Sequence, residues 1–595
     1  SFPAAGEDES DDSGDEQFHD DASDYASAIG PSVPPQKAGG STLANDPRAL
    51  LAAKRRATFS ANPAKRLKAV EQQVARERKT AIASTYVLVQ FQTMDGTDTG
   101  PQLELGTDTT QKQLEEVLNV VLENTDKTPY AFYVNAAEVM SNLHELFQQQ
   151  KLSTESVLEI KFEPLSVFRV HPVTRCTHTL PGHTDAVLCV AFSPDGQNLA
   201  SGGGDTVLRF WDVFSGLPKH TCRGHKHHVL SVAWSPDSRL LASADFKGKI
   251  QIWDPATGKP TSGVAIAGHR GHVTSLVWEP HHLNAACNRF ASSSKDHTVK
   301  IWNATTRRMV CSISGHTDSV ECVRWGGSGL IYTCSRDRTI RVWRLEGGRV
   351  PKVVRTLSGH GHRVNSIALS CDYVCRTGAF SHKDASFATR EAAFEAACAR
   401  YQAFRTGAGE GEGVGIAGTA AAATAAASSS SSGGGDGESS SSLVGGAGGG
   451  ERLISCSDDF TMFMWDPENS KRPVLRMTGH VQAVNHIAFS PDGRYFASAS
   501  FDRKVKVWDG RTGKFVATLH GHVAAVYQVC WSADSRLLVS ASKDGTVKVW
   551  SLRNLKKARF TLPGHRDEIY CVDWSPNGQR VASGSKDRTL KLWQS

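Results

Sequence analysis

The sequence predicts a mainly β fold built from copies of one unit and preceded by a small α+β domain. The unit is plainest from Gly479 to Asp509, where Val484 to Phe489, Tyr495 to Ser498 and Lys504 to Trp508 have the apolar and β-branched content of strands. Ser490 to Gly493 has the composition of a turn. Each strand is short and apolar on at least one face, so a single copy cannot bury itself. The copies must therefore pack against one another.

Two recurring residues of the unit give the number of its copies. The histidine of a Gly-His pair recurs eight times, at His183, His225, His269, His316, His360, His480, His522 and His565. A tryptophan closes each copy, at Trp211, Trp253, Trp302, Trp343, Trp465, Trp508, Trp550 and Trp593. Six positions before it stands an aspartate in seven copies, namely Asp205, Asp296, Asp337, Asp459, Asp502, Asp544 and Asp587. The second copy has Lys247 instead.

These Gly-His and Trp-Asp ends, with a period near 40, resemble the WD-repeat family, in which each unit supplies a four-stranded blade of a β-propeller. The resemblance implies a buried hydrogen-bonded chain in each unit, for example His522, Ser540 or Ser542, Asp544 and Trp550. A buried polar group without a hydrogen-bond partner lowers the folding stability by about 1 to 3 kcal/mol. We therefore expect every member of the set to be paired. A hydrolase triad is needed once, whereas this set is repeated, which favours a structural role.

The two ends of the repeats indicate how the ring closes. Only Gln594 and Ser595 follow Trp593, so the eighth unit lacks its outer strand. Val173 to Leu180, just before the first Gly-His, has the length and position to supply it. Pairing the ends removes exposed strand edges. We expect an eight-bladed propeller over residues 166–595, closed by this strand.

The overall composition indicates the class of protein. The chain has 595 residues, of which 39% are hydrophobic and 22% charged, with a net charge of +6. It has no run of 18 apolar residues, and we expect a globular protein with no membrane partner. Thirteen cysteines, mostly lone positions in predicted strands, suit reduced thiols of the cytosol or nucleus. Cys371 and Cys375 are not accompanied by a second pair of cysteines, which argues against a zinc site.

Residues 1–84 form an acidic and then basic extension that we expect to be disordered. Two basic clusters in it, separated by a polar spacer, have the spacing of a bipartite nuclear import signal: Lys54, Arg55, Arg56, Lys65, Arg66 and Lys68. A solvated basic helix and a phosphate-contacting arm are alternative interpretations.

Residues 85–165 have the pattern of a compact domain. Tyr86 to Gln92, Gln102 to Leu105, Tyr130 to Val134 and Val157 to Phe162 are predicted strands, and Thr110 can cap a helix between the second and third. Strand, strand, helix, strand, strand is the order of a ubiquitin-like β-grasp domain. It continues into the propeller and has no free Gly-Gly end, so it is expected to be a docking module rather than a conjugated modifier.

The fifth unit is interrupted by an insertion, residues 371–450. Phe387, Phe394, Cys398 and Tyr401 recur on one helical face, which predicts a helix over residues 385–404 packed on the ring. The Gly, Ala and Ser runs that follow predict a disordered loop. No GK[ST] motif accompanies the glycines, which argues against a nucleotide site.

A narrower resemblance emerges from the domain order. A ubiquitin-like domain followed by VFRVHPVTRCTHTLPGHTDAV and eight WD units resembles the Notchless family, over roughly Tyr86 to Ser595. The resemblance implies a nucleolar and nuclear assembly factor of the large (60S) ribosomal subunit, whose propeller binds the pre-60S particle. Its ubiquitin-like domain would dock on the AAA ATPase midasin, which remodels the particle and releases the factor by ATP-driven pulling.

The same resemblance implies a Mg²⁺ shared in trans. The adhesion site of midasin would complete the coordination of this ion with a carboxylate of the ubiquitin-like domain, and the chain would need no cofactor of its own. Glu138, close to Asn135 and directly after the strand at 130–134, matches the loop glutamate of the family. We expect it on an exposed loop, because a hard cation needs free oxygen ligands. Asp95, Asp98 and Glu115 are the alternatives, beside an ordinary surface role.

The turns that bear the repeat aspartates carry several basic residues, which are Lys295, Arg336, Arg338, Arg503, Lys543, Lys586 and Arg588. We call them the basic rim. Such a rim could attract rRNA phosphates or acidic assembly factors, or it could merely be solvated.

The sequence is compatible with three classes of function to different degrees. A non-catalytic assembly factor is favoured, with no small-molecule substrate. A general WD-repeat adaptor in ubiquitin or Notch signalling is the alternative. An enzyme is disfavoured, because the sequence has no unrepeated cluster of acid, base, nucleophile or metal ligands.

Overall fold

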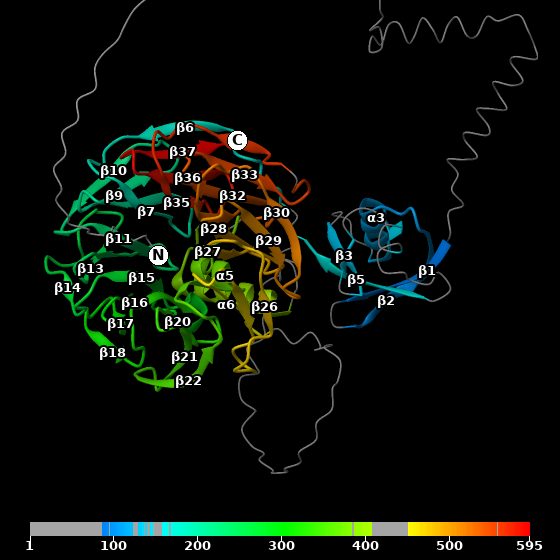
Figure 1. The fold of residues 1–595 in the computed structure, drawn as a ribbon, viewed down its shortest axis with the longest axis horizontal. Coiled ribbons are helices and arrows are strands. Elements are labelled where there is room, and N and C mark those ends of the chain that lie inside the picture. The colour runs from blue at the N-terminus through cyan, green and yellow to red at the C-terminus, as the bar shows by residue number, and fades with distance from the viewer. Residues whose placement is uncertain are drawn as a thin grey trace, which may run out of the picture.

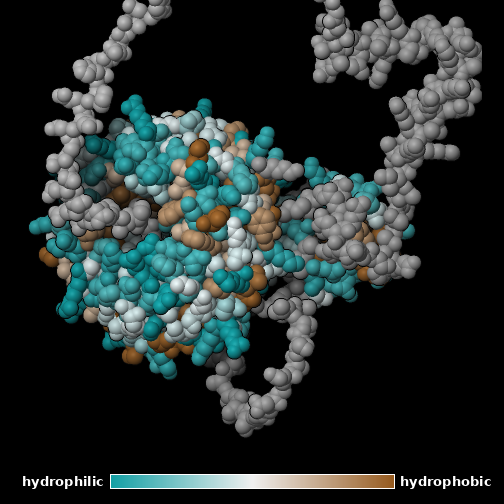
Figure 2. Space-filling model, viewed as in Figure 1, coloured by the Kyte–Doolittle hydropathy of each residue, from teal (hydrophilic) through white to brown (hydrophobic). Residues whose placement is uncertain are grey.

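The structure is a computed structural model that describes residues 86–93, 96–122, 129–135, 137–139, 143–144, 147, 157–165, 168–382, 386–406, 450–555 and 557–595. The predicted N-terminal extension with its two basic clusters, and the Gly/Ala/Ser loop at 407–449, lie outside the described residues. None of the described helices is long and apolar enough to cross a membrane. The face of the molecule seen in Figure 2 is mostly hydrophilic, with scattered apolar side chains.

The N-terminal domain is one mixed sheet with a helix. Its elements are β1 (Tyr86–Thr93), β2 (Asp98–Gly106), α3 (Gln111–Val121), β3 (Tyr130–Val134), β4 (Ala137–Glu138) and β5 (Leu158–Pro164). The strand order is β2-β1-β5-β3-β4, with β1 and β5 parallel and the other pairs antiparallel. In Figure 1 this domain lies beside the larger ring of sheets, next to β29 and β30.

Local sequence explains these elements. Along β1, Val89 and Phe91 are fully buried, whereas Leu88 between Val87 and Val89 is half exposed, as expected for a strand with one face on a core. Thr110 and Gln113 form a capping box at the start of α3. Leu114 and Leu118 then lie one turn apart on the face of the helix that joins the core.

The rest of the described chain forms eight four-stranded antiparallel sheets, numbered here along the sequence. From the centre outward, sheets 1 to 4 contain β7 (Val187–Phe192), β8 (Asn198–Gly203), β9 (Val207–Asp212), β10 (Pro218–Arg223); β11 (Val229–Trp234), β12 (Leu241–Asp245), β13 (Lys249–Trp253), β14 (Ile266–Ala267); β15 (Val273–Trp278), β16 (Arg289–Ser294), β17 (Val299–Asn303), β18 (Met309–Ile313); β19 (Val320–Trp325), β20 (Ile331–Ser335), β21 (Thr339–Glu346), β22 (Val350–Ser358).

Sheets 5 to 8 contain β23 (Val364–Leu369), β24 (Leu453–Ser457), β25 (Met462–Trp465), β26 (Leu475–Met477); β27 (Val484–Phe489), β28 (Tyr495–Ser500), β29 (Val505–Asp509), β30 (Phe515–Leu519); β31 (Val526–Trp531), β32 (Leu537–Ser542), β33 (Val547–Ser551), β34 (Phe560–Leu562); β35 (Ile569–Trp574), β36 (Arg580–Ser585), β37 (Leu590–Gln594), β6 (Arg175–Leu180). Each first strand contacts the first strand of the next sheet, and β35 contacts β7, so the inner strands form a closed circle (Figure 1).

Each sheet contains the polar chain implied by the repeats. In sheet 7, His522 Nε2 lies 2.7 Å from Ser540 Oγ, His522 Nδ1 lies 2.9 Å from Asp544 Oδ2, and Trp550 Nε1 donates to Ser540 Oγ at 2.9 Å. Ser540 is therefore the member of the chain, and Ser542 instead donates to backbone carbonyls. In sheet 4 a threonine, Thr333, takes the serine position.

Sheet 2 keeps its polar chain although its sequence departs from the register of the other copies. Lys247 occupies the expected aspartate position, yet the chain is complete, because Asp245 accepts in its place at 3.2 Å from His225 Nδ1. Ser243 lies between His225 Nε2 (2.6 Å) and Trp253 Nε1 (2.7 Å) as in the other sheets. Asp245 is fully buried and also accepts from the backbone N–H of Lys247.

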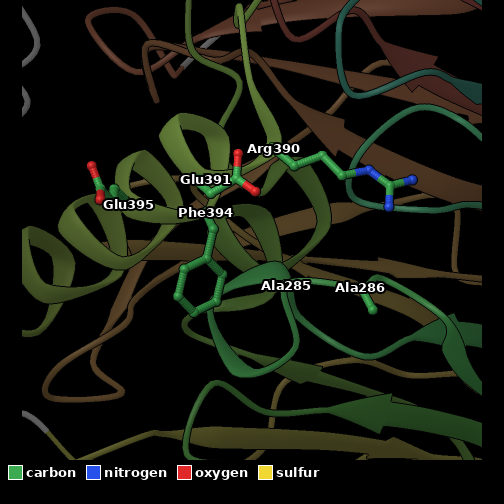
Figure 3. A pocket seen from close by; sticks show the side chains of 6 residues that line it. All are labelled: Ala285, Ala286, Arg390, Glu391, Phe394 and Glu395. Carbon is green, nitrogen blue, oxygen red and sulfur yellow. The ribbon is translucent and has the colours of Figure 1, made fainter.

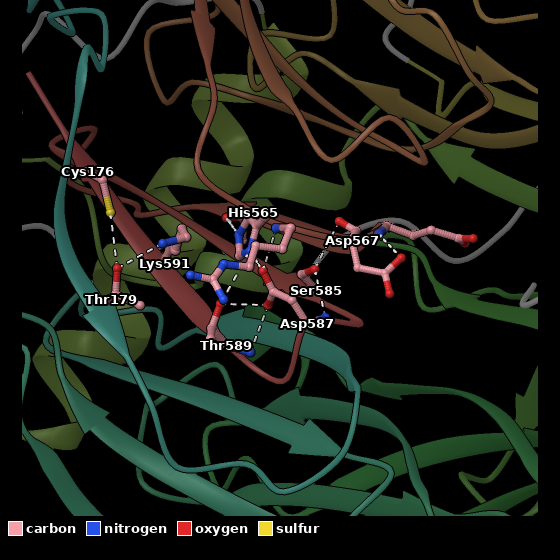
Figure 4. Close-up of polar contacts among 12 residues, drawn as sticks. Cys176, Thr179, His565, Asp567, Ser585, Asp587, Thr589 and Lys591 are labelled. Carbon is pink, nitrogen blue, oxygen red and sulfur yellow. Dashed lines mark hydrogen bonds and ion pairs between the residues drawn. The ribbon is translucent and has the colours of Figure 1, made fainter. Parts of the chain in front are cut away.

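The strand that precedes the first repeat closes the ring, as predicted. β6 pairs antiparallel with β37, from Leu180 opposite Leu590 to Arg175 opposite Gln594. Lys591 Nζ donates to Thr179 Oγ1 at 2.9 Å across this pair (Figure 4). The two ends of the repeat array are thereby joined in one sheet.

The described part of the insertion in sheet 5 contains the helices α5 (Asp372–Thr377) and α6 (Arg390–Thr406). The predicted helix thus starts at Arg390 rather than at 385. Phe387, expected on its apolar face, precedes the helix and packs on Phe380, with ring centroids 5.6 Å apart.

Buried Glu451 ties the insertion to sheet 4. Its carboxylate accepts hydrogen bonds from Tyr332 OH at 3.0 Å, Tyr401 OH at 3.2 Å and Ser328 N at 2.7 Å. A Cβ on Gly327 would come within 2.1 Å of the Tyr401 ring, so this approach requires glycine.

We predict that Asp245→Ala destabilises the fold by about 2 kcal/mol, because it leaves the buried His225 without its acceptor. Thermal or urea unfolding of the full chain measures the effect. Lys247→Ala, at the position that sequence register assigned to the chain, is the matched control and should change little. Equal effects of the two substitutions would contradict the assignment of Asp245.

Stability should also fall in acid. All eight aspartates of these polar chains have pKa values below the ordinary 3.8, since hydrogen bonds, including those from the paired histidines, outweigh burial, which raises the pKa: Asp205, Asp245, Asp296, Asp337, Asp459, Asp502, Asp544 and Asp587. A carboxyl group whose pKa is lower in the folded than in the unfolded chain stabilises the fold at any pH above its unfolded pKa. This contribution is lost as the pH falls through the folded pKa.

We therefore expect the urea midpoint to drop steeply below about pH 4. A shallower fall should begin below about pH 6.5, because burial lowers the pKa of His522, and lowers that of His486 to about 3, so both favour the neutral ring of the folded state. A midpoint constant down to pH 3 would refute the linkage.

Candidate functional site

The described part of the ring contains two hollows. A cavity of about 450 Å³ lies among the inner strands, bordered by α5, whose Arg376 Nη1 lies 3.0 Å from Asp573 Oδ1. A second hollow of about 410 Å³ lies where Phe394 of α6 faces Ala285 and Ala286 (Figure 3). The second is lined by two carboxylates and an arginine without a nucleophile. Among the residues that the structure describes, no cluster could hold a metal ion.

Glu138 lies where the N-terminal domain meets the ring, and this corrects the expectation of an exposed loop. It is part of β4, which pairs with β3 through Tyr133 opposite Glu138. Its side chain is only 16% exposed. Arg494 Nη2 lies 2.5 Å from Glu138 Oε1, and Tyr495 OH donates to Glu138 Oε2. Both carboxylate oxygens are therefore occupied by groups of sheet 6.

A second acidic residue of the N-terminal domain completes the contact. Arg511 Nη2 donates to Glu163 Oε1 at 2.6 Å, and Arg494 Nε lies 3.7 Å from Glu163 Oε2. Arg494 Nε also donates to Tyr133 OH at 2.7 Å. Burial raises the pKa of Glu163, although Arg511 and Arg494 oppose the rise. Burial likewise raises the pKa of Tyr133, which stays a neutral phenol.

The repeat fold places the two arginines side by side. Arg494 lies in the connection from β27 to β28, and Arg511 in the connection from β29 to β30. Because antiparallel strands alternate in direction, both connections lie at one edge of sheet 6. Gly510 N donates to Arg494 O at 2.6 Å, and a Cβ on Gly510 would come within 2.5 Å of Gly493 O. Glycine thus permits the close approach of the two connections.

The other candidate residues of this domain lie apart from the contact. Asn135 is exposed in the tight turn between β3 and β4, with φ 46°. Asp98 is exposed at the start of β2 and accepts from Gln92 Nε2 at 2.9 Å. Glu115 lies on α3, where burial raises its pKa despite nearby arginines. Asp95 is outside the described residues.

The basic rim lies at the opposite edge of the sheets from Arg494 and Arg511, because its turns join the second strand of each sheet to the third. Three of its members have acidic neighbours: Arg336 Nε lies 3.8 Å from Glu321, Lys543 Nζ 3.4 Å from Glu568, and Lys586 Nζ 3.9 Å from Asp567. The others form no ion pair with another described residue, and these are Lys295, Arg338, Arg503 and Arg588.

Sequence reasoning missed the partners of Glu138. Arg494 follows the Ser-Pro-Asp-Gly turn of its repeat, a position at which Gln197, Arg239 and Gln579 of other sheets are exposed. Its own side chain is 6% exposed. The contact joins residues 356 positions apart in sequence, and no local pattern signals it.

Comparison with known proteins agrees with both parts of the fold. A family model described as "NLE (NUC135) domain" matches residues 87–147. One described as "WD domain, G-beta repeat" matches 174–212, 216–254, 261–303, 307–344, 471–509, 513–551 and 556–594. None of these segments spans sheet 5, which the insertion interrupts. The designed protein Ika8 shares the fold with a TM-score of 0.50 at 21% identity, over 71% of this chain and 100% of that one.

Several relatives match over most of their length. The chain is 42% identical over 403 residues to "Protein Notchless" of Drosophila melanogaster, covering 67% of this chain and 73% of the relative. It is 45% identical over 422 residues to "Notchless protein homolog" of Arabidopsis thaliana, covering 71% and 80%. It is 41% identical over 450 residues to "Ribosome assembly protein 4" of Saccharomyces cerevisiae, covering 73% and 79%. With both its N-terminal domain and its repeats accounted for, the chain belongs to the family of Notchless and ribosome assembly protein 4.

Proposed function

We propose that the protein is a non-catalytic assembly factor for the large (60S) ribosomal subunit that acts in the nucleolus and nucleus. The observation that carries this proposal is the combination of an NLE domain and WD repeats in one chain, at 41% identity to a relative named for ribosome assembly. An assembly factor needs surfaces rather than a reaction centre, and this chain offers two at opposite edges of its sheets.

We infer that the ring is an eight-bladed propeller that binds the pre-60S particle. Eight sheets with inner strands in a closed circle support this inference. The order β2-β1-β5-β3-β4, with β1 and β5 parallel and the helix α3 among the described residues, likewise supports a ubiquitin-like docking domain at residues 85–165.

The docking partner that we propose is midasin. Glu138 would supply a carboxylate oxygen to a Mg²⁺ held by the adhesion site of midasin, since hard cations take oxygen ligands. The chain itself would hold no cofactor. In the described conformation Arg494 and Tyr495 occupy both oxygens of Glu138, so this contact has to open before the metal can bind. ATP-driven pulling on the N-terminal domain would then remodel the particle and release the factor.

Glu138→Ala should weaken binding of the full chain to the isolated adhesion domain of midasin by about 100-fold or more, because a charged ligand is lost. Glu138→Asp should behave similarly, since its carboxylate is one methylene shorter. Calorimetry with and without Mg²⁺ measures the effect. Glu104→Ala, an exposed carboxylate of β2, is the matched control.

Unchanged affinity of the Glu138 variants would reject this residue as the ligand. In that case Asp98→Ala should be tested next, because Asp98 is the exposed alternative.

The basic rim is the second proposed surface. Reversal of Lys295, Arg338, Arg503 and Arg588 to glutamate should reduce co-sedimentation with pre-60S particles and flatten its dependence on salt, since each lost phosphate contact lowers the slope by nearly one unit. Reversal of Arg239, exposed on the opposite edge, is the control.

Unchanged particle association after all four reversals would mean that the rim is only solvated. Co-sedimentation with ubiquitin-ligase complexes in place of ribosomal precursors would favour the general adaptor instead.

A further inference from the structure

We propose that the propeller carries a carboxylate-binding site, formed by Arg494, Tyr495 and Arg511 of sheet 6, which holds the N-terminal domain and competes with a metal ion for Glu138. We call it the docking site. The docking itself stands on the contacts alone. The competition with a metal rests on the function proposed above.

The docking site has the features of a built recognition site. The guanidinium of Arg494 contacts two aromatic rings, with its Cζ 5.6 Å from the centre of the Tyr133 ring and 5.4 Å from that of Tyr495. Its nitrogens contact Glu138 Oε1 at 2.5 Å and Tyr133 OH at 2.7 Å. A buried arginine needs such a set of acceptors, because a buried charge is tolerated only when it is paired. A surface arginine in a chance contact would not be enclosed in this way.

The charges of the contact are balanced in number and position. Two arginines of sheet 6 face two glutamates of the N-terminal domain, with Arg511 on Glu163 at 2.6 Å and Arg494 on Glu138. The Cζ of Arg511 also lies 5.6 Å from the centre of the Tyr133 ring. Tyr133 of β3 therefore contacts both arginines. This single side chain helps to fix how the N-terminal domain is positioned on sheet 6.

Docking and metal binding exclude each other. Tyr495 OH and Arg494 hold the two oxygens of Glu138, whose side chain is nearly covered. A cation bound by another protein needs one of these oxygens and space around it. The N-terminal domain is thus either docked or available. The docked fraction lowers the apparent affinity for any partner that needs free Glu138.

The connection between the domains favours the docked state. Ten residues, 165–174, separate β5 from β6, so the N-terminal domain remains near the docking site at a high effective concentration. One contact of the docked state is weak. Glu163 Oε2 is buried and has no hydrogen-bond partner among the described residues, and its contact with Arg494 Nε is an ion pair at 3.7 Å. A buried oxygen without a hydrogen bond stabilises the docked state less than a fully bonded one, which favours displacement by a metal-bearing partner.

The experiment uses the full chain and two independent measurements. Hydrogen–deuterium exchange of residues 130–138 and 490–495 reports docking, and calorimetry with the Mg²⁺-loaded adhesion domain of midasin reports binding. Arg494→Gln should expose both segments to exchange and raise the affinity about ten-fold. Arg239→Gln, the exposed arginine at the same repeat position of sheet 2, should change neither. Thermal unfolding confirms that each variant is folded.

A charge exchange separates release of the domain from damage to the fold. Glu138→Arg combined with Arg494→Glu should restore protection of both segments while abolishing binding to the adhesion domain. Saturation of the wild-type chain with the adhesion domain should expose residues 490–495 to exchange, as Arg494→Gln does.

Continued protection of residues 490–495 in the saturated complex would overturn the competition, and unchanged exchange in Arg494→Gln would overturn the docking site. If Arg494→Gln loses protection from exchange, but neither the wild-type chain nor the variant binds the adhesion domain, the docking site is supported. The proposal that midasin competes for Glu138 is then wrong.

Discussion

The ring depends on histidines whose two nitrogens are both occupied. In each sheet the histidine lies between a serine or threonine of the second strand and an aspartate, which comes from the following turn in all sheets but the second, and the tryptophan donates to the same hydroxyl. This chain fixes the segment that enters each sheet against the strands that follow. Because every inner strand contacts two neighbours, an entry segment out of place would disturb both. Sheet 2 shows that the geometry is the constraint, since Asp245 provides the acceptor from a different position.

Most of the fold could be predicted because it repeats. Eight copies of Gly-His and Trp define the sheets, and the missing last strand points to Val173 to Leu180 as its replacement. The errors of the fold prediction arose in the insertion, where no repeat guides the prediction and some contacts are not local. Nothing in the sequence near Cys371 predicts α5, whose Asp372 accepts from the backbone of Leu369 and whose Arg376 pairs with Asp573 across the ring. Phe387 fits a helical period, yet it packs on Phe380 ahead of α6.

The candidate site shows the same limit more sharply. Glu138 was expected on an exposed loop because a hard cation needs free oxygen ligands, and its place after β3 was predicted correctly. Its exposure depends on Arg494 and Tyr495, which lie in a distant repeat, and the position of Arg494 is exposed in sheets 1, 2 and 8. Burial raises the pKa of Glu163 for the same reason, through groups that no local pattern brings together. The basic rim, at the opposite edge of the sheets, remains accessible while the N-terminal domain is docked.

The short connection between β5 and β6 also determines how mechanical tension would enter the molecule. Tension applied to the N-terminal domain passes along residues 165–174 directly into the strand that completes sheet 8. Two contacts intercept it on the way, Val170 N with Asp534 at 2.9 Å and Arg536 with Phe168 O at 3.5 Å, and Val173 is wedged in the core between sheets 7 and 8. Under such tension these contacts would transfer part of the load to sheet 7 before it reaches the pairing of β6 with β37.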